Sequence, residues 1–409
     1  MGRWSRRSTA FFCAEARART LLPLGKRCPS KSCCGVGALD LGVHLYIHVP
    51  FCARRCSYCD FAIAVRRNVP SDAYVAAVLR EWAIWQTDPV WDLSPEIQTV
   101  YFGGGTPSRL EPGAIARLLN AFRCDRRVSE TAEITLEANP EDVTPEAAAF
   151  WREAGVNRIS LGVQSFDPAV LSWMHRTHTL EQVGQAVDIL RRAQLDEISL
   201  DLIFGLPAAL ERNWSDDLDH AFALDPQHLS LYGLTIEPHT PLGQWTARGE
   251  ISPVDEERYA AEFLAAHAAL AAHGYEHYEV SNAAKPGHRA RHNSAYWQRA
   301  PFIGLGPSAH SGFGPERRWN VRNWAAYERL LEAGKSPLGG SELLNSASIG
   351  LEELYLCLRT HEGLDAGRVP KATTHAWTSQ GWALQVGARI QLTSEGWLRL
   401  DALVPTLQS

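Results

Sequence analysis

Residues 45–61 read LYIHVPFCARRCSYCDF, and this stretch decides the fold and the chemistry expected of the chain. An apolar, β-branched run leads directly into Cys52, Cys56 and Cys59, which have C-x3-C-x2-C spacing. Among 409 residues there are 9 cysteines, a density far below that of a disulfide-stabilised scaffold. Three cysteines within one eight-residue window are instead typical of metal ligation. The segment therefore predicts a strand followed by a metal-binding loop.

Three thiolates on one short loop suit an iron–sulfur cluster. A [4Fe–4S] cubane has four irons, so three cysteines leave one iron open to a small ligand. Arg54 and Arg55, inside the loop, either favour thiolates and an anionic cluster or are solvated loop charges. The loop alone therefore predicts a cluster with one available iron.

Two alternatives stay open from the residues. Zinc also accepts three cysteines and one histidine, and His48 or His44 could complete such a site, giving a zinc-stabilised binding module. The three cysteines could also be a chance grouping. Cys124 and Cys357 stand alone in apolar helical stretches, so we expect them to be small core residues.

From residue 43 onward, apolar runs alternate with amphipathic stretches, the pattern of repeated βα units. The predicted strands are 43–49, 97–102, 133–138, 156–162, 196–204 and 228–235. Helices are predicted at 71–86, 111–122, from Thr144 onward, 179–193, 213–224 and 254–273. Six units are fewer than the eight that close a barrel, so we predict an α/β fold, an open partial (β/α)6 TIM-like barrel. Its function is expected at the carboxyl ends of the strands.

Four regions are expected along the chain: a leader at 1–40, the barrel at 41–275, a barrel-flanking segment at 276–340, and a small domain at 341–409. That domain shows a helix at about 346–360, a second near 374–384, and two alternating runs in RIQLTSEGWLRLDAL around a glycine-containing turn. These features predict a winged-helix-like α+β domain. Its five basic and seven acidic residues disfavour DNA binding.

The leader has eight Lys or Arg within residues 1–31 against the single acid Glu15. It is interpreted as a disordered start-site extension or a transit peptide, with unstructured cysteines. The formal net charge of the whole chain is -6, so the body is acidic and a poor nucleic-acid binder. With no apolar run of about 18 residues, any membrane contact is expected to be peripheral. The expected compartment is the cytoplasm, or the mitochondrion if the leader is a transit peptide.

Glycine and polar residues follow the predicted strands. FGGGTPS ends the second strand, where glycines let the backbone approach a ligand. Glu137 follows the third strand, Gln164 and then Arg176 follow the fourth, and Asp201 lies in the fifth. Each could instead be a loop, cap or structural hydrogen-bonding residue, but the strand ends of a parallel sheet meet at one edge. A shared binding cavity is therefore predicted.

The cysteine loop, with Tyr58 directly before Cys59, resembles the radical S-adenosylmethionine (SAM) superfamily. This resemblance implies a [4Fe–4S] cluster on Cys52, Cys56 and Cys59, whose open iron chelates the amino and carboxylate groups of SAM. It also implies that a reduced cluster cleaves the sulfonium to a 5′-deoxyadenosyl radical. The protein then supplies orientation and exclusion of solvent and oxygen.

The motifs from Tyr46 to the C-terminus together resemble the oxygen-independent coproporphyrinogen III oxidase family. That resemblance implies that the cluster-bound SAM is held by Tyr46, Tyr58, Gly104 and Glu137. It implies that the rest of the pocket, or a second SAM molecule, is contacted by Gly105, Thr106, Gln164, Arg176, Asp201 and Thr235. One or two cofactor molecules stay open.

Phe61 stands where the oxidase has a further cysteine, and C-x3-C-x2-C-x-F is similar to the HemW-type haem chaperone branch of that family. RHNSAYW provides an H-N-x-x-Y-W motif, which the resemblance assigns to haem through His292, Asn293, Tyr296 and Trp297. An imidazole can bind haem iron and aromatic rings can cover the porphyrin. Without the resemblance, a histidine beside two aromatics is usually structural. The glycine-rich segment with His310 is expected near the pocket mouth.

The resemblance thus implies a haem-handling radical SAM protein that delivers haem to respiratory haem proteins, its expected clients. A porphyrinogen oxidase-like enzyme is the main alternative, and no catalytic residue is assigned. Whether SAM is cleaved, and whether the chain forms a homodimer, stay open.

Overall fold

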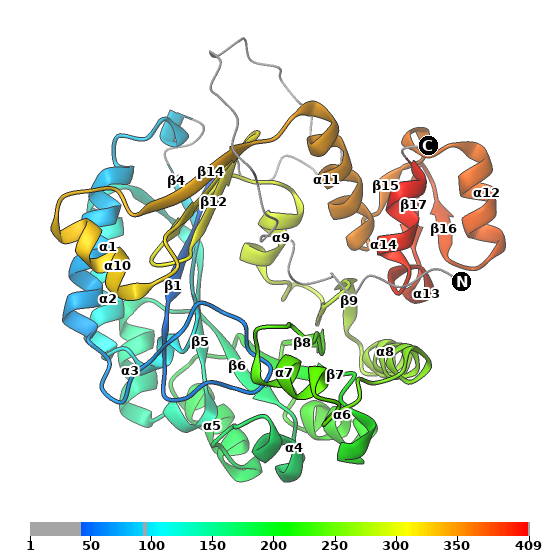
Figure 1. Cartoon of the computed structure of the whole chain (residues 1–409), viewed down its shortest axis with the longest axis horizontal. Helices are drawn as coiled ribbons and strands as arrows, with labels where there is room; N and C mark the ends of the chain where they lie inside the picture. Colours follow the sequence, from blue (N-terminus) through cyan, green and yellow to red (C-terminus); the bar gives the residue numbers. More distant parts are fainter. Residues whose placement is uncertain (1–41, 93–95, 408–409) are drawn as a thin grey trace.

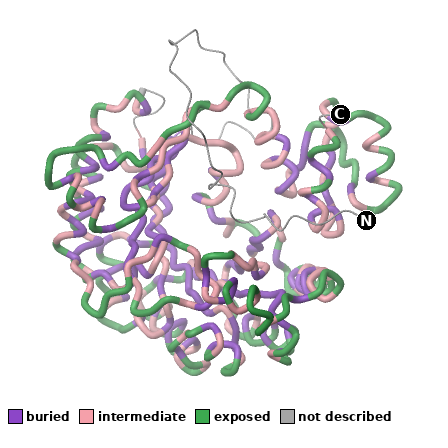
Figure 2. The backbone as a smooth tube through the Cα atoms, viewed as in Figure 1, coloured by how far each residue is buried: buried purple, intermediate pink, exposed green. Residues whose placement is uncertain are grey.

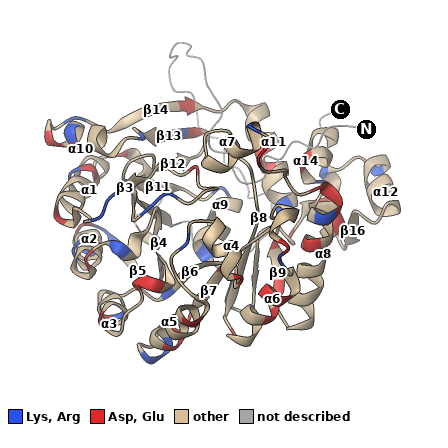
Figure 3. Cartoon of the chain, turned by 60° about the horizontal axis from the view of Figure 1, so that its bottom comes forward, with Lys and Arg blue, Asp and Glu red and all other residues tan. Residues whose placement is uncertain are grey.

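A computed structural model describes residues 42–92 and 96–407 of the chain. The expectations for the basic leader and its cysteines lie outside these described residues. Within them, no helix combines the length and the apolar character needed to span a bilayer. Acidic and basic residues are interspersed over the helices (Figure 3).

Six parallel strands form the centre of the molecule, and the prediction of an α/β fold with a partial barrel is confirmed (Figure 1). In spatial order these strands are β1 (Val43–Val49), β4 (Glu96–Gly104), β5 (Arg127–Ala138), β6 (Arg158–Gln164), β7 (Ile198–Phe204) and β8 (His228–Gly233). The outer helices are α1 (Ser71–Trp85), α2 (Pro112–Asp125), α3 (Pro145–Ala154), α5 (Leu180–Arg192), α6 (Trp214–Ala223) and α8 (Glu256–Ala272). The strand and helix order follows the predicted βα alternation.

Local sequence explains where these helices begin and end. The Thr144 side chain accepts a hydrogen bond from the amide of Ala147 at 3.1 Å, and Pro145 occupies the first turn of α3. Gly155 then ends α3 with φ of 101°, a conformation that favours glycine. Helix α5 begins with a capping box between Thr179 and Gln182. The buried residues gather along the sheet and the inner faces of these helices (Figure 2).

The sheet extends beyond the six parallel strands at both edges, which the sequence did not predict. Beyond β8 lie the antiparallel strands β10 (Asn282–Ala284) and β9 (Glu276–Glu279). Beyond β1 lie β11 (Phe302–Leu305), β12 (His310–Phe313), β13 (Glu316–Asn320) and β14 (Leu338–Leu343). Strand β11 is parallel to β1 and the next three pair antiparallel. Residues 276–343 therefore complete one 12-stranded sheet.

Two short helices of this region position the site described below. Helix α9 (Arg291–Trp297) lies on the concave side of the sheet, and α10 (Trp324–Glu332) packs beside α1 (Figure 1). A bond from the hydroxyl of Tyr327 ties α10 to the buried carboxylate of Glu81 in α1 at 2.5 Å. This carboxylate also accepts from the amide of Gly306 at 2.8 Å, so α1 and the added strands are fixed together.

The C-terminal residues form helices around a three-stranded sheet. Its elements are α11 (Ser346–Arg359), β15 (Leu364–Asp365), α12 (Lys371–Ser379), β16 (Ala383–Val386), β17 (Arg389–Leu392), α13 (Ser394–Trp397) and α14 (Leu400–Leu403).

Two expectations for these residues were wrong. The helix expected near 374–384 is α12, which ends earlier, at Ser379, before Gly381 at φ of 73°. The second run of RIQLTSEGWLRLDAL is helical, because the Thr393 side chain caps the start of α13 and the helix places Trp397 in a buried position. The hairpin instead turns at Gly387 between β16 and β17.

Cys124 and Cys357 differ from one another in burial. Cys357 is buried in α11, as expected of a core residue. The expectation was wrong for Cys124, which is exposed near the end of α2, because it lies on the outer face next to Arg123 and Asp125.

Candidate functional site

A cavity of about 670 Å³ opens at the carboxyl ends of the parallel strands. The loop after β1 brings the three cysteines and Tyr58 to it. The ends of the next five strands bring the polar residues predicted from the sequence. The cavity is lined by every predicted cluster and SAM residue, namely Tyr46, Cys52, Cys56, Tyr58, Cys59, Gly104, Gly105, Thr106, Glu137, Gln164, Arg176, Asp201 and Thr235.

Backbone hydrogen bonds hold the cysteine loop. The amide of Ser57 donates to the carbonyl of Met174 at 3.4 Å, and the amide of Leu242 donates to the carbonyl of Ser57 at 2.9 Å. The two-residue strand β2 (Phe51–Cys52) pairs with β3 (Ala64–Val65) on the loop's return. The loop is therefore anchored to segments far away in the sequence.

The three cysteines are free thiols that line one cavity. Burial raises the pKa of Cys59 to about 12, and the nearby Cys56 and Cys52 raise it further. Burial likewise raises the pKa of Cys52. A bound metal reverses this effect, because a coordinating thiol loses its proton. Two donors already face the sulfurs: the Thr106 hydroxyl lies 3.5 Å from Cys52 Sγ, and Arg176 Nη1 lies 4.0 Å from Cys56 Sγ.

These residues fit a cubane cluster. Arg176 places a cationic guanidinium beside the cysteines, and its buried Nε has no hydrogen-bond partner in the described part of the chain. In the described part of the chain, no three His, Cys, Asp or Glu side chains converge as the ligands of one metal ion do. A cubane does not require that convergence, because each thiolate binds a different iron.

The two histidines of the zinc alternative are occupied elsewhere. His48 Nε2 donates to the carbonyl of Ala62 at 3.0 Å, which leaves Nδ1 to accept from the hydroxyl of Tyr46 at 3.2 Å. Burial lowers the pKa of His48 to about 4, so its ring is neutral. His44 Nδ1 lies 2.9 Å from the hydroxyl of Thr99. Among the described residues, neither histidine joins the cysteines in a group that could hold one metal ion.

The glycine triplet lets two backbones and a carboxylate approach closely. Gly104 has φ of 112°, and a Cβ atom there would lie 2.5 Å from the His48 ring. A Cβ atom on Gly105 would lie 2.8 Å from the backbone of Pro50. The Gly104 amide donates to Glu137 Oε2 at 2.9 Å, and the Tyr101 hydroxyl donates to Glu137 Oε1 at 2.8 Å. Substituting these glycines would displace the loop from the carboxylate.

Two half-buried carboxyl groups line the cavity. Burial raises the pKa of Glu137 to about 7, and the neighbouring Asp201 adds to the increase. Burial raises the pKa of Asp201 to about 6, although the hydroxyl of Ser160 donates to it at 2.9 Å. Both groups would ionise more readily beside a bound cation, so the cavity favours a ligand that has positive charge.

The structure separates the four residues of the H-N-x-x-Y-W motif. Only Tyr296 lines the cavity. His292 is 1% exposed, with Nδ1 at 2.6 Å from the Thr99 hydroxyl and Nε2 at 2.9 Å from the Tyr296 hydroxyl. Trp297 instead stacks against the Arg359 guanidinium, 4.4 Å from the ring centre. For His292 to bind an iron, it would have to leave both of its hydrogen bonds.

Sequence reasoning missed other residues of the cavity. Asn139 accepts a hydrogen bond from Arg176 Nη2 at 2.6 Å and so orients the guanidinium. Tyr232, at the end of β8, also lines the cavity. Both stand at strand ends, the position that indicated the other residues, so the same signal could have identified them. His310 lines the cavity as expected for the glycine-rich segment.

Comparisons with known proteins agree with this geometry. Residues 46–221 match the Radical SAM superfamily. "Heme chaperone HemW" of Mycobacterium tuberculosis (strain H37Rv) is 35% identical over 371 residues, covering 89% of this chain and 94% of that protein. "Heme chaperone HemW" of Escherichia coli is 39% identical over 267 residues, covering 65% and 69%. "Radical S-adenosyl methionine domain-containing protein 1, mitochondrial" of Bos taurus is 35% identical, covering 66% and 61%.

A solved structure shares the fold. The coproporphyrinogen III oxidase HemN from Escherichia coli, described as a Radical SAM enzyme, superposes with a TM-score of 0.74 at 21% identity over 90% of each chain. The fold and the cysteine loop thus define a radical SAM protein, a superfamily that uses SAM and a [4Fe–4S] cluster. Within it, this chain belongs to the HemW family of haem chaperones. The resemblance seen in the sequence is confirmed.

Proposed function

We propose that this protein binds haem and delivers it to haem-requiring respiratory proteins, with a [4Fe–4S] cluster on Cys52, Cys56 and Cys59 and SAM in the adjoining cavity. The observation that carries the proposal is that three free thiols, and no fourth cysteine of the described residues, line one cavity of about 670 Å³. The HemW names of the relatives support the haem part.

The chain's own residues suit the cluster and SAM. When bound together, a reduced cluster and SAM supply one-electron chemistry. Arg176 offsets the negative charge that the thiolates bring, since its Nη1 lies 4.0 Å from Cys56 Sγ. Glu137 and Asp201 provide carboxylates for the amino group, the sulfonium charge or the ribose hydroxyls of SAM. Gly104 fixes Glu137 through its amide.

The remaining predicted SAM residues surround the same space. Tyr46 and Tyr58 add aromatic walls, and Thr106, Gln164 and Thr235 add polar side chains. Gly105 keeps the wall thin where its amide donates to the carbonyl of Val49 at 2.7 Å. In this proposal these residues contact the adenosine and ribose of SAM, or a second SAM molecule.

The haem contact is proposed at the cavity wall formed by α9. Tyr296 reaches the cavity, and His292 holds its hydroxyl from behind. In this arrangement Tyr296 contacts haem, and His292 acts through Tyr296 unless haem binding releases its ring. Asn293 and Trp297 belong to the same helix, α9, as His292 and Tyr296. The proposal also includes respiratory client proteins, a peripheral membrane contact and a homodimer. It places the protein in the cytoplasm or the mitochondrion.

One anaerobic preparation tests this function. Protein reconstituted with iron and sulfide is assayed for haem uptake by absorbance, and then for transfer of that haem to a haem-free respiratory protein. Haem uptake followed by transfer is expected. The same preparation is incubated with coproporphyrinogen III, SAM and a reductant. Formation of protoporphyrinogen would contradict the chaperone assignment, as would the absence of haem uptake.

A further inference from the structure

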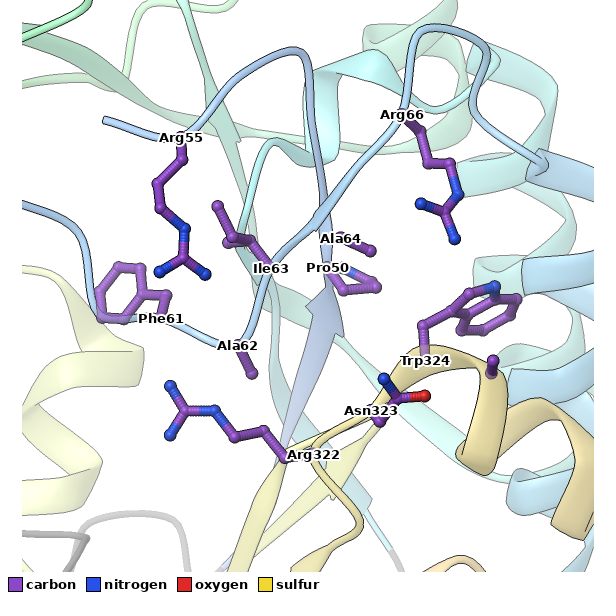
Figure 4. A pocket seen from close by; sticks show the side chains of 11 residues that line it. Pro50, Arg55, Phe61, Ala62, Ile63, Ala64, Arg66, Arg322, Asn323 and Trp324 are labelled. Atoms are coloured by element: carbon purple, nitrogen blue, oxygen red, sulfur yellow. The ribbon is translucent and has the colours of Figure 1, made fainter. Parts of the chain in front are cut away.

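A second cavity, of about 400 Å³, adjoins the first. One side is formed by the chain that leaves the cysteine loop, and the other by the start of α10 (Figure 4). Phe61, Ala62, Ile63 and Arg322 line both cavities. The two cavities are therefore neighbouring compartments that share a wall, and we refer to the smaller one as the basic cavity.

Three arginines line the basic cavity: Arg55, Arg66 and Arg322. In Figure 4, Arg55 and Arg322 extend on either side of residues 61–62, and Arg66 lies toward Trp324. Of the residues that the structure describes, no acidic one is part of the lining. The three arginines give this small space a positive charge, so an anion would bind favourably.

The three guanidinium groups are not neutralised by the fold. Arg66 donates to the carbonyl of Val65 at 2.9 Å, and Arg322 donates to the carbonyl of Asp60. Within residues 42–92 and 96–407, none of the three arginines forms an ion pair with a carboxylate. Glu328 on α10 interacts electrostatically with Arg66 but does not form an ion pair with it. Each arginine thus keeps most of its donors for a ligand.

Apart from Arg322, the wall between the two cavities is apolar and aromatic. Phe61 is 58% exposed, so its ring is covered by little of the protein. A flat apolar ligand would cover that ring and gain the free energy of burying both surfaces. Trp324 is buried on the other side, 5.3 Å from the Phe51 ring and 5.8 Å from the Tyr74 ring, which gives the basic cavity a rigid floor.

We propose that the basic cavity binds the propionate edge of haem, an inference that rests on the proposed haem binding. Arg55, Arg66 and Arg322 pair with the two carboxylates, because the guanidinium fork matches a carboxylate. The macrocycle then lies over Phe61 and extends into the larger cavity toward Tyr296. A ligand with a flat apolar ring and carboxylates on one edge fits a basic compartment separated from a larger one by an exposed aromatic ring.

The test compares two probes on the full-length, anaerobically reconstituted protein. Haemin has free propionates, whereas haemin dimethyl ester has none. Arg66→Ala and Arg322→Ala lie outside the cysteine loop, and Arg67→Ala is the matched control, because Arg67 is exposed next to Arg66 but does not line the basic cavity. Iron and sulfide content checks that each variant keeps its cluster.

The wild type is expected to bind haemin about tenfold more tightly than the ester. Arg66→Ala and Arg322→Ala should each weaken haemin binding about fivefold, and the double variant about 20-fold, with little change for the ester. Arg67→Ala should match the wild type. Equal haemin affinities in all variants, or losses of equal size for haemin and ester, would overturn this inference alone. A wild type that binds neither probe would overturn the proposed function as well.

Discussion

Arg176 reaches Cys56 from a position 120 residues further along the chain, and its Nη1 lies 4.0 Å from the cysteine sulfur. The same guanidinium donates to Asn139 Oδ1 at 2.6 Å and to the carbonyl of Gly162 at 2.8 Å. These bonds fix a positive charge beside the thiol that lies in the middle of the cysteine motif. The Arg176 guanidinium therefore connects the loop after β1 to the end of β6.

Replacing Arg176 should change the cluster's potential without removing the cluster. Arg176→Gln removes the charge and keeps a donor, so we expect full iron content and a more negative reduction potential, because net charge near a cluster sets its potential. The reduction potential of Arg176→Lys should lie between those of the wild type and Arg176→Gln. Potentiometric titration followed by electron paramagnetic resonance (EPR) measures this shift. An unchanged potential in Arg176→Gln would show that the guanidinium does not act on the cluster.

Cys56→Ala should abolish cluster assembly, because two thiolates rarely hold a cubane. Iron and sulfide per chain are expected to fall from about four each to near zero. Cys124→Ala is the matched control, because Cys124 is an exposed free thiol on α2 and its variant should retain the wild-type content. Retention of full iron content by Cys56→Ala would exclude this ligand set.

SAM binding should strengthen as the pH rises through the pKa of Glu137, which burial raises to about 7. The protonated carboxyl does not attract a cation, so affinity rises with ionisation and should be about tenfold higher at pH 8 than at pH 6. The effect on folding has the opposite sign. Because the pKa of Glu137 is higher in the folded protein than in the unfolded chain, this carboxyl lowers the free energy of unfolding as the pH rises from the unfolded-chain pKa toward 7.

The control for this pH dependence is Glu137→Gln, which can still accept one of the two hydrogen bonds from Tyr101 and Gly104. Its affinity for SAM should be lower and should vary less with pH, with the remaining variation near the pKa of Asp201 at about 6. Isothermal titration at several pH values measures both proteins. Equal pH profiles would remove Glu137 from the account.

Tyr296→Phe and His292→Ala should weaken haem binding together if His292 acts through the tyrosine hydroxyl. The first variant keeps the ring in the cavity wall and removes only the hydroxyl that lies 2.9 Å from His292 Nε2. The second removes a buried ring that forms hydrogen bonds with the hydroxyls of both Thr99 and Tyr296, so it should cost about 1–3 kcal/mol of stability. Both should keep the cluster. Unchanged haem titrations in both would remove α9 from the haem site.

Gly104→Ala should destabilise the protein by about 1–3 kcal/mol, because it forces a side chain into φ of 112°. It should also weaken SAM binding by displacing the amide that holds Glu137. Gly113→Ala is the matched control: this glycine lies in α2 with open space around it, so alanine should be neutral or stabilise by about 0.5–1 kcal/mol. Denaturant unfolding measures both. Equal effects would contradict the structural role of Gly104.

The sequence predicted the elements whose pattern is strong and local. The six parallel strands are nearly continuous apolar runs, as in β1, whose burial leaves only Tyr46 half-buried. Strands β9 to β13 have three to five residues each and gain their place from partners far along the chain, which periodicity does not reveal. The run after Gly396 alternates like a strand, but the Thr393 cap and the burial of Trp397 make it helical.

The residues that line the cavity could be predicted where the rule of strand ends applies, and less well where side-chain direction decides. Glu137, Gln164 and Asp201 reach one cavity because their strands are parallel neighbours. His292 and Tyr296 are four residues apart on one short helix, yet only the tyrosine reaches the cavity. That difference depends on contacts with Thr99 in β4, which lies 193 residues away.

The most direct measurement is the EPR spectrum of the reduced, anaerobically reconstituted protein before and after addition of SAM. If three cysteines hold a cubane with one iron available, the reduced protein should give a [4Fe–4S] signal that shifts when SAM coordinates that iron. A spectrum that SAM leaves unchanged, or protein that contains zinc in place of iron and sulfide, would contradict the account.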